Sequence, residues 1–107
     1  MGIFDFFKGP DINEGIKKFM AEKRAVLIDV READEYAGGH IKGSRNIPLS
    51  KFDKIITSAV TDKTMPVYVY CQSGGRSSQA ASKLTKLGYD NVNNIGGIGS
   101  YKGRLEK

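Results

Sequence analysis

Cysteine and histidine each occur only once in this chain of 107 residues, as Cys71 and His40. A single cysteine excludes a disulfide within the chain. A zinc site uses about four ligands, which one cysteine and one histidine cannot supply without an unusual share of carboxylates. We therefore expect no metal site and no other cofactor, and any thiol chemistry must use Cys71.

Long apolar runs are also missing. No stretch approaches the ~20 apolar residues of a membrane-spanning helix, and residues 1–9 have no basic region ahead of their apolar side chains, which Asp5 interrupts. Phe6 stands where an N-myristoylation motif has Ser or Thr. We therefore expect no secretory signal, no stable membrane association and a cytoplasmic protein whose thiol stays reduced. Residues 1–10 are expected to form a loosely ordered N-terminal segment.

The charges are spread along the chain rather than gathered. Lys and Arg total 17 against 12 Asp and Glu, a formal net charge of +5. No block of about five like charges occurs, and no basic stripe is interleaved with aromatic residues, so a nucleic-acid partner is not indicated. The excess is compatible with attraction of small anions. The length predicts a single domain over residues 1–107.

In the first half of the chain, a helix, a buried strand and a short helix follow one another. Residues 11–14 resemble a capping box with the aspartate as cap, and apolar residues at helical spacing predict a helix up to about residue 23. The apolar run 25–30 predicts a strand buried on both faces. Residues 31–36 predict a short helix before a double glycine, and residues 47–49 a very short strand.

The second half repeats this alternation. Residues 50–53 resemble another capping box and predict a helix up to about residue 59. Residues 67–70 predict a strong strand, the segment after the next turn a helix that Gly88 ends, and residues 92–95 a weak strand. The alternation predicts an α/β fold with a small central parallel β-sheet flanked by helices on both faces. Functional sites in such sheets lie beyond the carboxyl ends of the strands.

The turn between the strand at 67–70 and the following helix combines a thiol, glycines and a positive charge. Gly74 and Gly75 let the backbone curl so that successive N–H groups point inward at an anion, and the helix start adds its own free N–H groups. Cys71 at the bottom of this cradle should have a lowered pKa, which favours the nucleophilic thiolate. Arg76 adds a fork of donors suited to an oxyanion, and Ser77 can cap the helix or donate to the sulfur.

The spacing within this turn distinguishes between two chemistries. Four residues separate Cys71 from Arg76, whereas cysteine phosphatases use the longer C-x5-R spacing to hold a tetrahedral phosphate. The shorter loop makes a smaller nest, suited to a single sulfur atom. A buried, inert cysteine at the end of a strand is the alternative that the sequence leaves open.

Three segments of the chain resemble the single-domain rhodaneses, which are sulfurtransferases. They are residues 29–49 (DVREADEYAGGHIKGSRNIPL), residues 71–77 (CQSGGRS) and residues 87–98 (LGYDNVNNIGGI), in the family's order and spacing. Agreement over three motifs is more specific than any one of them. The resemblance covers the chain from about residue 25 to its end, and it implies a small parallel sheet wrapped by helices.

The resemblance also implies a mechanism. Cys71 takes a sulfane sulfur from thiosulfate or a persulfide, holds it as a persulfide, and passes it to a thiophilic acceptor such as cyanide in vitro or a thiol in the cell. Because the chain has one cysteine, the acceptor must be an external molecule. In the cell this is expected to be a thiol, and a protein thiol is one such acceptor. The substrate-binding residues implied are those of the loop: Gln72, Ser73, Gly74, Gly75, Arg76 and Ser77.

Other residues receive supporting or structural roles. The resemblance implies that Asp29 and Arg31 link loops beside the active site, and that His40 belongs to a structural turn rather than acting as a general base. The residues between Cys71 and Arg76 are neutral, whereas relatives that favour thiosulfate often carry basic residues there, so persulfide donors remain open. Two alternative functions remain: a non-catalytic module that binds an anion or a partner, and a cysteine phosphatase of the cell-division-cycle type.

Overall fold

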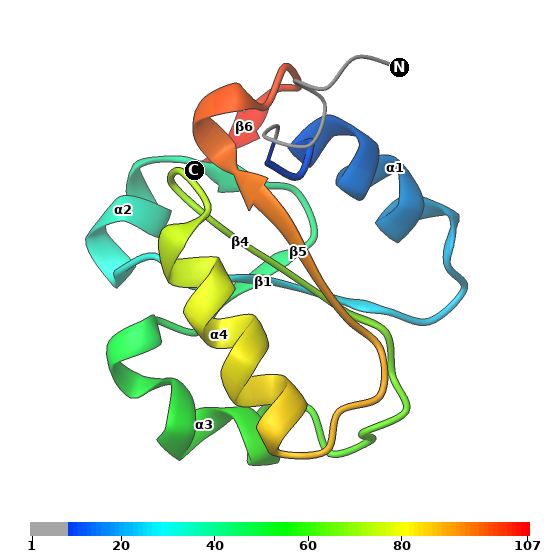
Figure 1. The fold of residues 1–107 in the computed structure, drawn as a ribbon. Helices are drawn as coiled ribbons and strands as arrows, with labels where there is room; N and C mark the ends of the chain where they lie inside the picture. Colours follow the sequence, from blue (N-terminus) through cyan, green and yellow to red (C-terminus); the bar gives the residue numbers. More distant parts are fainter. Residues whose placement is uncertain (1–8) are drawn as a thin grey trace.

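Four parallel strands form the central sheet of the computed structural model, which describes residues 9–107. They are β1 (Val26–Asp29), β3 (Ser44–Asn46), β4 (Val67–Cys71) and β5 (Val92–Gly97), in the order β3-β1-β4-β5 (Figure 1). Their parallel pairing confirms the α/β fold that the sequence predicts. The loosely ordered N-terminal segment predicted from the sequence covers residues 1–10. Residues 1–8 of it lie outside the described residues.

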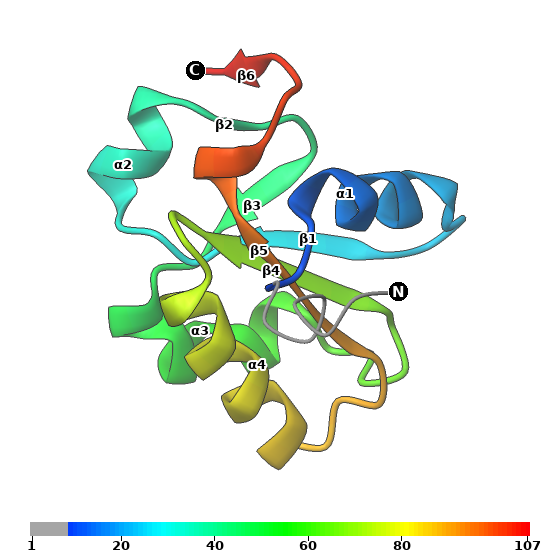
Figure 2. The same cartoon turned by 45° about the horizontal axis from the view of Figure 1, so that its top comes forward.

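Helices cover both faces of this sheet. On one face lie α3 (Phe52–Ala59) and α4 (Gly75–Lys86), and on the other lies α1 (Ile12–Ala21), as Figure 2 shows. The short helix α2 (Ala33–Gly38) follows β1. Side chains alternate across a strand, so Val69 of β4 packs toward α3 and α4 while Tyr68 packs toward α1.

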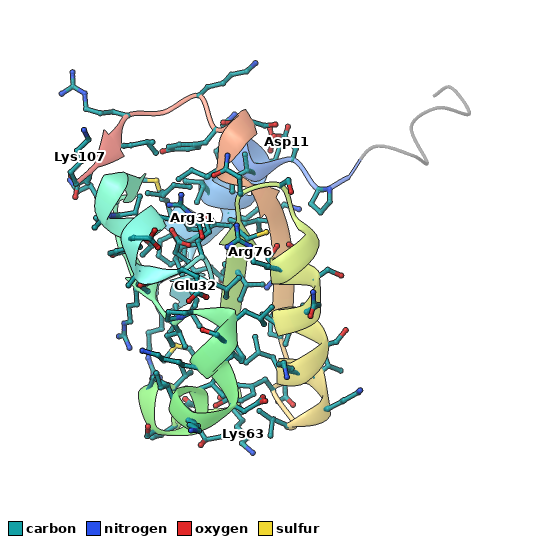
Figure 3. All side chains as sticks on the ribbon, turned by 90° about the vertical axis from the view of Figure 1, so that its left-hand side faces the viewer. Asp11, Arg31, Glu32, Lys63, Arg76 and Lys107 are labelled. Carbon is teal, nitrogen blue, oxygen red and sulfur yellow. The ribbon has the colours of Figure 1, made fainter. Side chains whose placement is uncertain are left out.

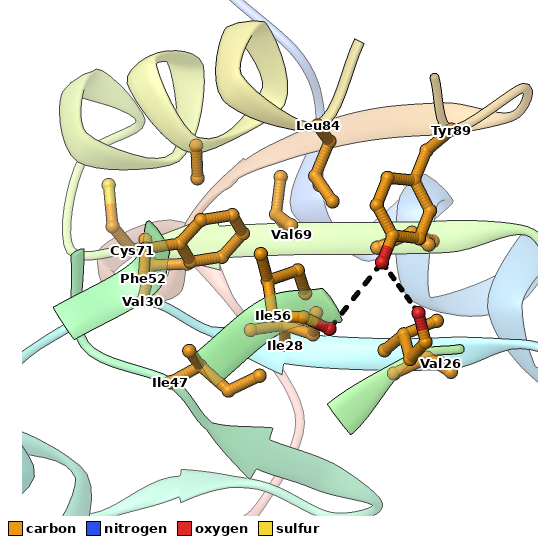
Figure 4. Packing of buried hydrophobic residues seen from close by; sticks show 13 residues of the cluster. Val26, Ile28, Val30, Ile47, Phe52, Ile56, Val69, Cys71, Leu84 and Tyr89 are labelled. Carbon is orange, nitrogen blue, oxygen red and sulfur yellow. Dashed lines mark hydrogen bonds between the residues drawn. The ribbon is translucent and has the colours of Figure 1, made fainter. Parts of the chain in front are cut away.

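The sheet therefore separates two apolar cores. The larger core joins the sheet to α3 and α4 through buried side chains such as Ile28, Phe52 and Leu84 (Figure 4). Cys71 also belongs to this core, so its side chain points toward the helices. At its far end the Tyr89 hydroxyl donates to the backbone carbonyls of Ile56 and Val60, which satisfies polar groups inside an apolar cluster.

Of the two predicted capping boxes, the first supplies only its N-cap residue and the second is wrong. Asp11 is the N-cap of α1 as predicted, and its carboxylate accepts from the Asn13 N–H. Ser50, however, lies inside a short 3-10 helix, η2 (Leu49–Lys51), and its hydroxyl donates to the Glu32 carboxylate instead of capping α3. Helix α3 begins after Lys51 with no side-chain cap, because the 3-10 turn already orients the chain.

The strand predicted over residues 47–49 is also misplaced. The edge strand is instead β3, which ends just before that segment. Its residues are polar, so they show no apolar pattern that would predict a strand. Two further strands were not predicted: β2 (His40–Ile41) and β6 (Leu105–Glu106), which pair antiparallel near the C-terminus. Strand β5 extends beyond the predicted residues through its double glycine, and a short 3-10 helix, η3 (Ile98–Ser100), follows.

Candidate active site

Cys71 is the last residue of β4 and lies at the carboxyl edge of the sheet, where the chain turns into α4. Its side chain is buried, with 1% of the residue's surface exposed. The Gly74 N–H donates to the sulfur at 3.0 Å, and the Ser77 hydroxyl lies 3.4 Å from it. Both donors come from the loop and the first turn of α4, within six residues of Cys71 in the chain.

These hydrogen-bond donors lower the pKa of the Cys71 thiol. Burial raises the pKa of the thiol, but hydrogen bonds from the Ser77 hydroxyl and from the N–H groups of Ser77, Gly74 and Ser73 act in the opposite direction. Their combined effect holds the pKa of Cys71 below its ordinary value. The loop therefore favours the thiolate, the nucleophilic form of cysteine.

The helix after the loop starts earlier than predicted. Gly74 is the N-cap of α4, with a φ of 107° in the left-handed region that glycine enters without a steric penalty. Ser77 is therefore not the cap. It lies buried in the first turn, where its hydroxyl contacts the Cys71 sulfur and lies 3.1 Å from the Gly74 carbonyl.

Asn94 on β5 completes this cluster, and the sequence gave no sign of it. Its side-chain oxygen accepts from the Ser77 hydroxyl at 2.7 Å and from the Gly96 N–H at 3.1 Å. An asparagine in a weak, polar strand is typical of an exposed edge. Only the parallel pairing of β4 with β5 brings it beside the loop.

The double glycine of β5 supports the loop from behind. The Gly99 N–H donates to the Gln72 carbonyl at 3.2 Å. A Cβ atom added at Gly97 would lie 2.6 Å from the Ser73 Cα, so no larger residue fits there without moving the loop. The close approach explains why β5 ends in glycine at this point.

Arg76 and Glu35 form an ion pair at the rim of the loop. Two parallel hydrogen bonds join the guanidinium to the carboxylate, at 2.6 Å and 3.0 Å. Hydrogen bonding to Arg76 is the main reason that the pKa of Glu35 falls to about 2. The donor fork that the sequence assigned to an incoming anion is therefore held by Glu35, which lies 41 residues earlier in the chain.

Asp29 and Arg31 form a second pair, deeper in the molecule. Both residues are buried, and the guanidinium contacts the carboxylate at 2.9 Å and the Gly39 carbonyl at 2.6 Å. The Asn46 amide donates to the backbone carbonyls of both residues. All of these partners belong to neighbouring strands and loops, an arrangement that suits the linking role expected for the pair.

His40 lies on β2, stacked on the ring of Tyr36 with the ring centres 3.8 Å apart. Its Nδ1 lies 2.9 Å from the Tyr36 carbonyl oxygen. These contacts hold it in the α2–β2 turn. The hydrogen bonds to the Cys71 sulfur come instead from the Gly74 N–H and the Ser77 hydroxyl.

A groove of about 630 Å³ opens beside the loop, between Gln72 and Ser73 on one side and Asp11 and Ser100 on the other. Among the described residues that line it there is one charged side chain, that of Asp11. Over residues 9–107, no three His, Cys, Asp or Glu side chains are grouped as metal ligands would be. No helix within this range is long and apolar enough to cross a membrane.

The comparison with protein-family models decides the family. Residues 13–104 match the model of the rhodanese-like domain. The chain belongs to the rhodanese-like domain family. This agrees with the resemblance found in the sequence and with the parallel sheet and its helices.

Individual proteins and solved structures are also similar to this chain. The thiosulfate sulfurtransferase PspE of Escherichia coli is 44% identical over 71 residues, a match that covers 66% of this chain and 68% of that protein. The uncharacterized protein YqhL of Bacillus subtilis is 46% identical over 85 residues, covering 78% of this chain and 66% of that protein. A solved structure of a rhodanese with anions from E. coli superimposes with a TM-score of 0.72 at 38% identity, covering 78% of this chain and 98% of that one.

Proposed function

We propose that this rhodanese-like chain, acting as a single domain, is a sulfurtransferase that carries a sulfane sulfur on Cys71. The observation that carries the proposal is the Cys71 thiol at the bottom of a loop whose N–H groups and Ser77 hydroxyl favour its thiolate. Its likeness to a thiosulfate sulfurtransferase and to a rhodanese solved with anions supports the same reaction.

The first half-reaction loads the sulfur. The Cys71 thiolate attacks the outer sulfur of thiosulfate or of an organic persulfide, a Cys71 S–S bond forms, and the donor's S–S bond breaks. Sulfite or a thiolate leaves with the electron pair of the broken bond. The loop N–H groups from Gln72 to Ser77 then face the terminal sulfur and stabilise its negative charge.

In the second half-reaction an external nucleophile takes the sulfur. Cyanide or a thiol attacks the terminal sulfur, and the S–S bond to Cys71 breaks, which restores the thiolate. Because the chain has a single cysteine, no second thiol of its own can act as the acceptor. The reaction should follow ping-pong kinetics, as a covalent intermediate requires. It also needs a reduced Cys71, in line with the predicted cytoplasmic location.

The intact mass of the reduced protein tests this proposal. After exposure to thiosulfate or to a low-molecular-weight persulfide, we expect a gain of one sulfur atom, which cyanide then removes. Cys71→Ala should gain no sulfur while it keeps a cooperative unfolding transition, because alanine removes the nucleophile from a site that the rest of the core surrounds.

Failure to gain sulfur from either donor would contradict the proposal. A thiol pKa near the free-peptide ~8.5, together with that failure, would favour a non-catalytic binding module. Turnover of an aryl phosphate that Cys71→Ser abolishes would instead favour a phosphatase.

A further inference from the structure

The rim of the loop, where Arg76 and Glu35 lie, offers less positive charge to a ligand than the net charge of the whole chain suggests. The formal net charge is +5, yet the arginine of the active-site loop is paired. Arg76 and Glu35 are joined by two hydrogen bonds, and each side chain is about a third exposed, 33% and 31%. A bidentate pair of this kind fixes both groups and leaves little net charge for a ligand that approaches from solvent.

Glu35 is also held from its own side. Its carboxylate accepts the Glu32 N–H at 2.9 Å, in a capping box at the start of α2. This bond holds the carboxylate in place independently of Arg76, so the guanidinium meets a partner that is already oriented. Figure 3 shows Arg76 and Arg31 in the region between α2 and the start of α4, and Arg31 has its own carboxylate partner in Asp29.

Arg76 is nevertheless close enough to influence Cys71. Hydrogen bonding to Glu35 is the main cause that raises the pKa of Arg76, and the Cys71 thiolate raises it further through space. The groove beside the loop adds no compensating cation, because Asp11 is the one charged side chain among the described residues that line it. Among the described residues, the charges at the rim and in the groove are thus the Arg76–Glu35 pair and the Asp11 carboxylate.

This charge distribution matters because the two donor classes differ in charge. Thiosulfate is a dianion, and it must approach a thiolate that is itself negative. An organic persulfide carries at most one negative charge on its outer sulfur, and none when that sulfur is protonated. The repulsion between the donor and Cys71 is therefore largest for thiosulfate, and a paired arginine offsets little of it.

We propose that Glu35 is a specificity-determining residue that neutralises Arg76 and so makes organic persulfides, rather than thiosulfate, the preferred sulfur donors. The proposal rests on the sulfur-transfer function proposed above. The loading step is balanced as follows: the Cys71 thiolate bonds to the outer sulfur of R–S–SH, the S–S bond of the donor breaks, and R–S⁻ leaves with its electron pair.

Single-turnover loading, followed by intact mass after a rapid quench, tests the preference without an acceptor. The probes are thiosulfate and 2-hydroxyethyl persulfide, whose only ionisable group is the persulfide itself, at equal concentrations. Wild-type protein should load faster from the persulfide. Glu35→Gln keeps an oxygen for the Glu32 N–H but removes the charge, so Arg76 is freed. We expect the rate constant for thiosulfate to rise about fivefold, a gain that added salt reduces, with a smaller change for the persulfide.

Two further variants separate this effect from others. Asp34→Asn removes the same charge from an exposed neighbour in the first turn of α2, and it should not change the donor preference. In a background that already carries Arg76→Gln, the Glu35→Gln change should no longer raise the thiosulfate rate, because no guanidinium is left for it to free. Circular dichroism and an unfolding curve for each variant confirm that it folds.

Several results would overturn the proposal. These are wild-type protein that loads faster from thiosulfate, an unchanged preference in Glu35→Gln, an equal shift in Asp34→Asn, or a thiosulfate gain from Glu35→Gln that persists in the Arg76→Gln background. If Glu35→Gln does not fold, the salt dependence of thiosulfate loading by wild-type protein decides. Salt screens the repulsion between thiosulfate and the thiolate, so a paired arginine predicts loading that speeds up with added salt, whereas a free arginine adds an attraction that salt weakens and predicts loading that does not speed up. Failure of the wild type to load from either donor would instead overturn the proposed function itself.

Discussion

The Ser77 hydroxyl has one proton and three acceptors within reach. The Asn94 oxygen lies 2.7 Å away, the Gly74 carbonyl 3.1 Å and the Cys71 sulfur 3.4 Å. A charged acceptor forms the stronger hydrogen bond, so ionisation of Cys71 draws this proton toward the sulfur. Ser77 therefore stabilises the thiolate more than the thiol, and this difference adds to the effect of the loop N–H groups in lowering the pKa of Cys71.

Replacement of Ser77 by alanine should raise the pKa of Cys71, because burial then meets fewer opposing hydrogen bonds. The pH profile of Cys71 alkylation by iodoacetamide measures this, and its midpoint should move to higher pH. Since the raised pKa leaves less thiolate at neutral pH, sulfur loading at that pH should slow in parallel. Ser78→Ala is the matched control, because Ser78 is the next residue of α4 and is exposed. Equal profiles for both variants would contradict a role for the Ser77 hydroxyl.

At the scale of elements, β5 supports the loop that follows Cys71. The strand presents Asn94 to the first turn of α4 and Gly97 to the backbone of Gln72 and Ser73. The position of the loop thus depends on contacts with a strand that follows it in the chain by about one helix. A change in that strand should act on the chemistry without touching the thiol.

Gly97→Ala tests this dependence. The added methyl group would collide with the backbone at Gln72 and Ser73, so the loop must move. We expect a loss of stability of about 1–3 kcal/mol, as for other overpacked sites, and a drop in the sulfur-loading rate of about tenfold or more. Urea unfolding and intact mass measure the two effects.

Gly38→Ala is the control for this variant, since a Cβ at Gly38 would meet no atom within 4 Å. It should leave both stability and loading close to wild type. Wild-type loading by Gly97→Ala would mean that the loop does not depend on this contact.

At the scale of the whole molecule, the buried pair of Asp29 and Arg31 ties the centre of the sheet to its surroundings. The carboxylate comes from the central strand β1, and the guanidinium reaches the Gly39 carbonyl beyond α2. Both side chains are almost fully removed from solvent, with 0% and 6% exposed. Removal of one partner therefore leaves a charge in an environment that does not solvate it.

Asp29→Ala should lower the free energy of unfolding by about 3–5 kcal/mol, because it leaves the Arg31 charge buried and unpaired. Equilibrium urea denaturation measures the loss. The double variant Asp29→Leu with Arg31→Met removes both charges and should recover most of it. A loss below about 1 kcal/mol in Asp29→Ala would show that solvent reaches the arginine and that the pair is not structural in this sense.

Much of this site follows from neighbours in the sequence. The glycines, the thiol and Ser77 lie within one short segment, and the alternation of strands with helices places that segment at the carboxyl edge of a parallel sheet. The sequence did not predict the elements whose local residue patterns are weak. The edge strand β3 is polar, β2 and β6 have two residues each, and a 3-10 turn took the place of the predicted cap at Ser50.

The sequence by itself determined the lone cysteine, the length of the loop after it and the fold that carries both. These depend on residue type, on spacing and on hydrophobic pattern, which act over a few residues. Only the tertiary structure decided that Glu35 holds Arg76 and that Asn94 meets Ser77, across 41 and 17 residues of chain. Such pairings depend on how α2, α4 and β5 pack around the sheet, so no local pattern specifies which carboxylate an arginine meets or whether its charge is available to a ligand.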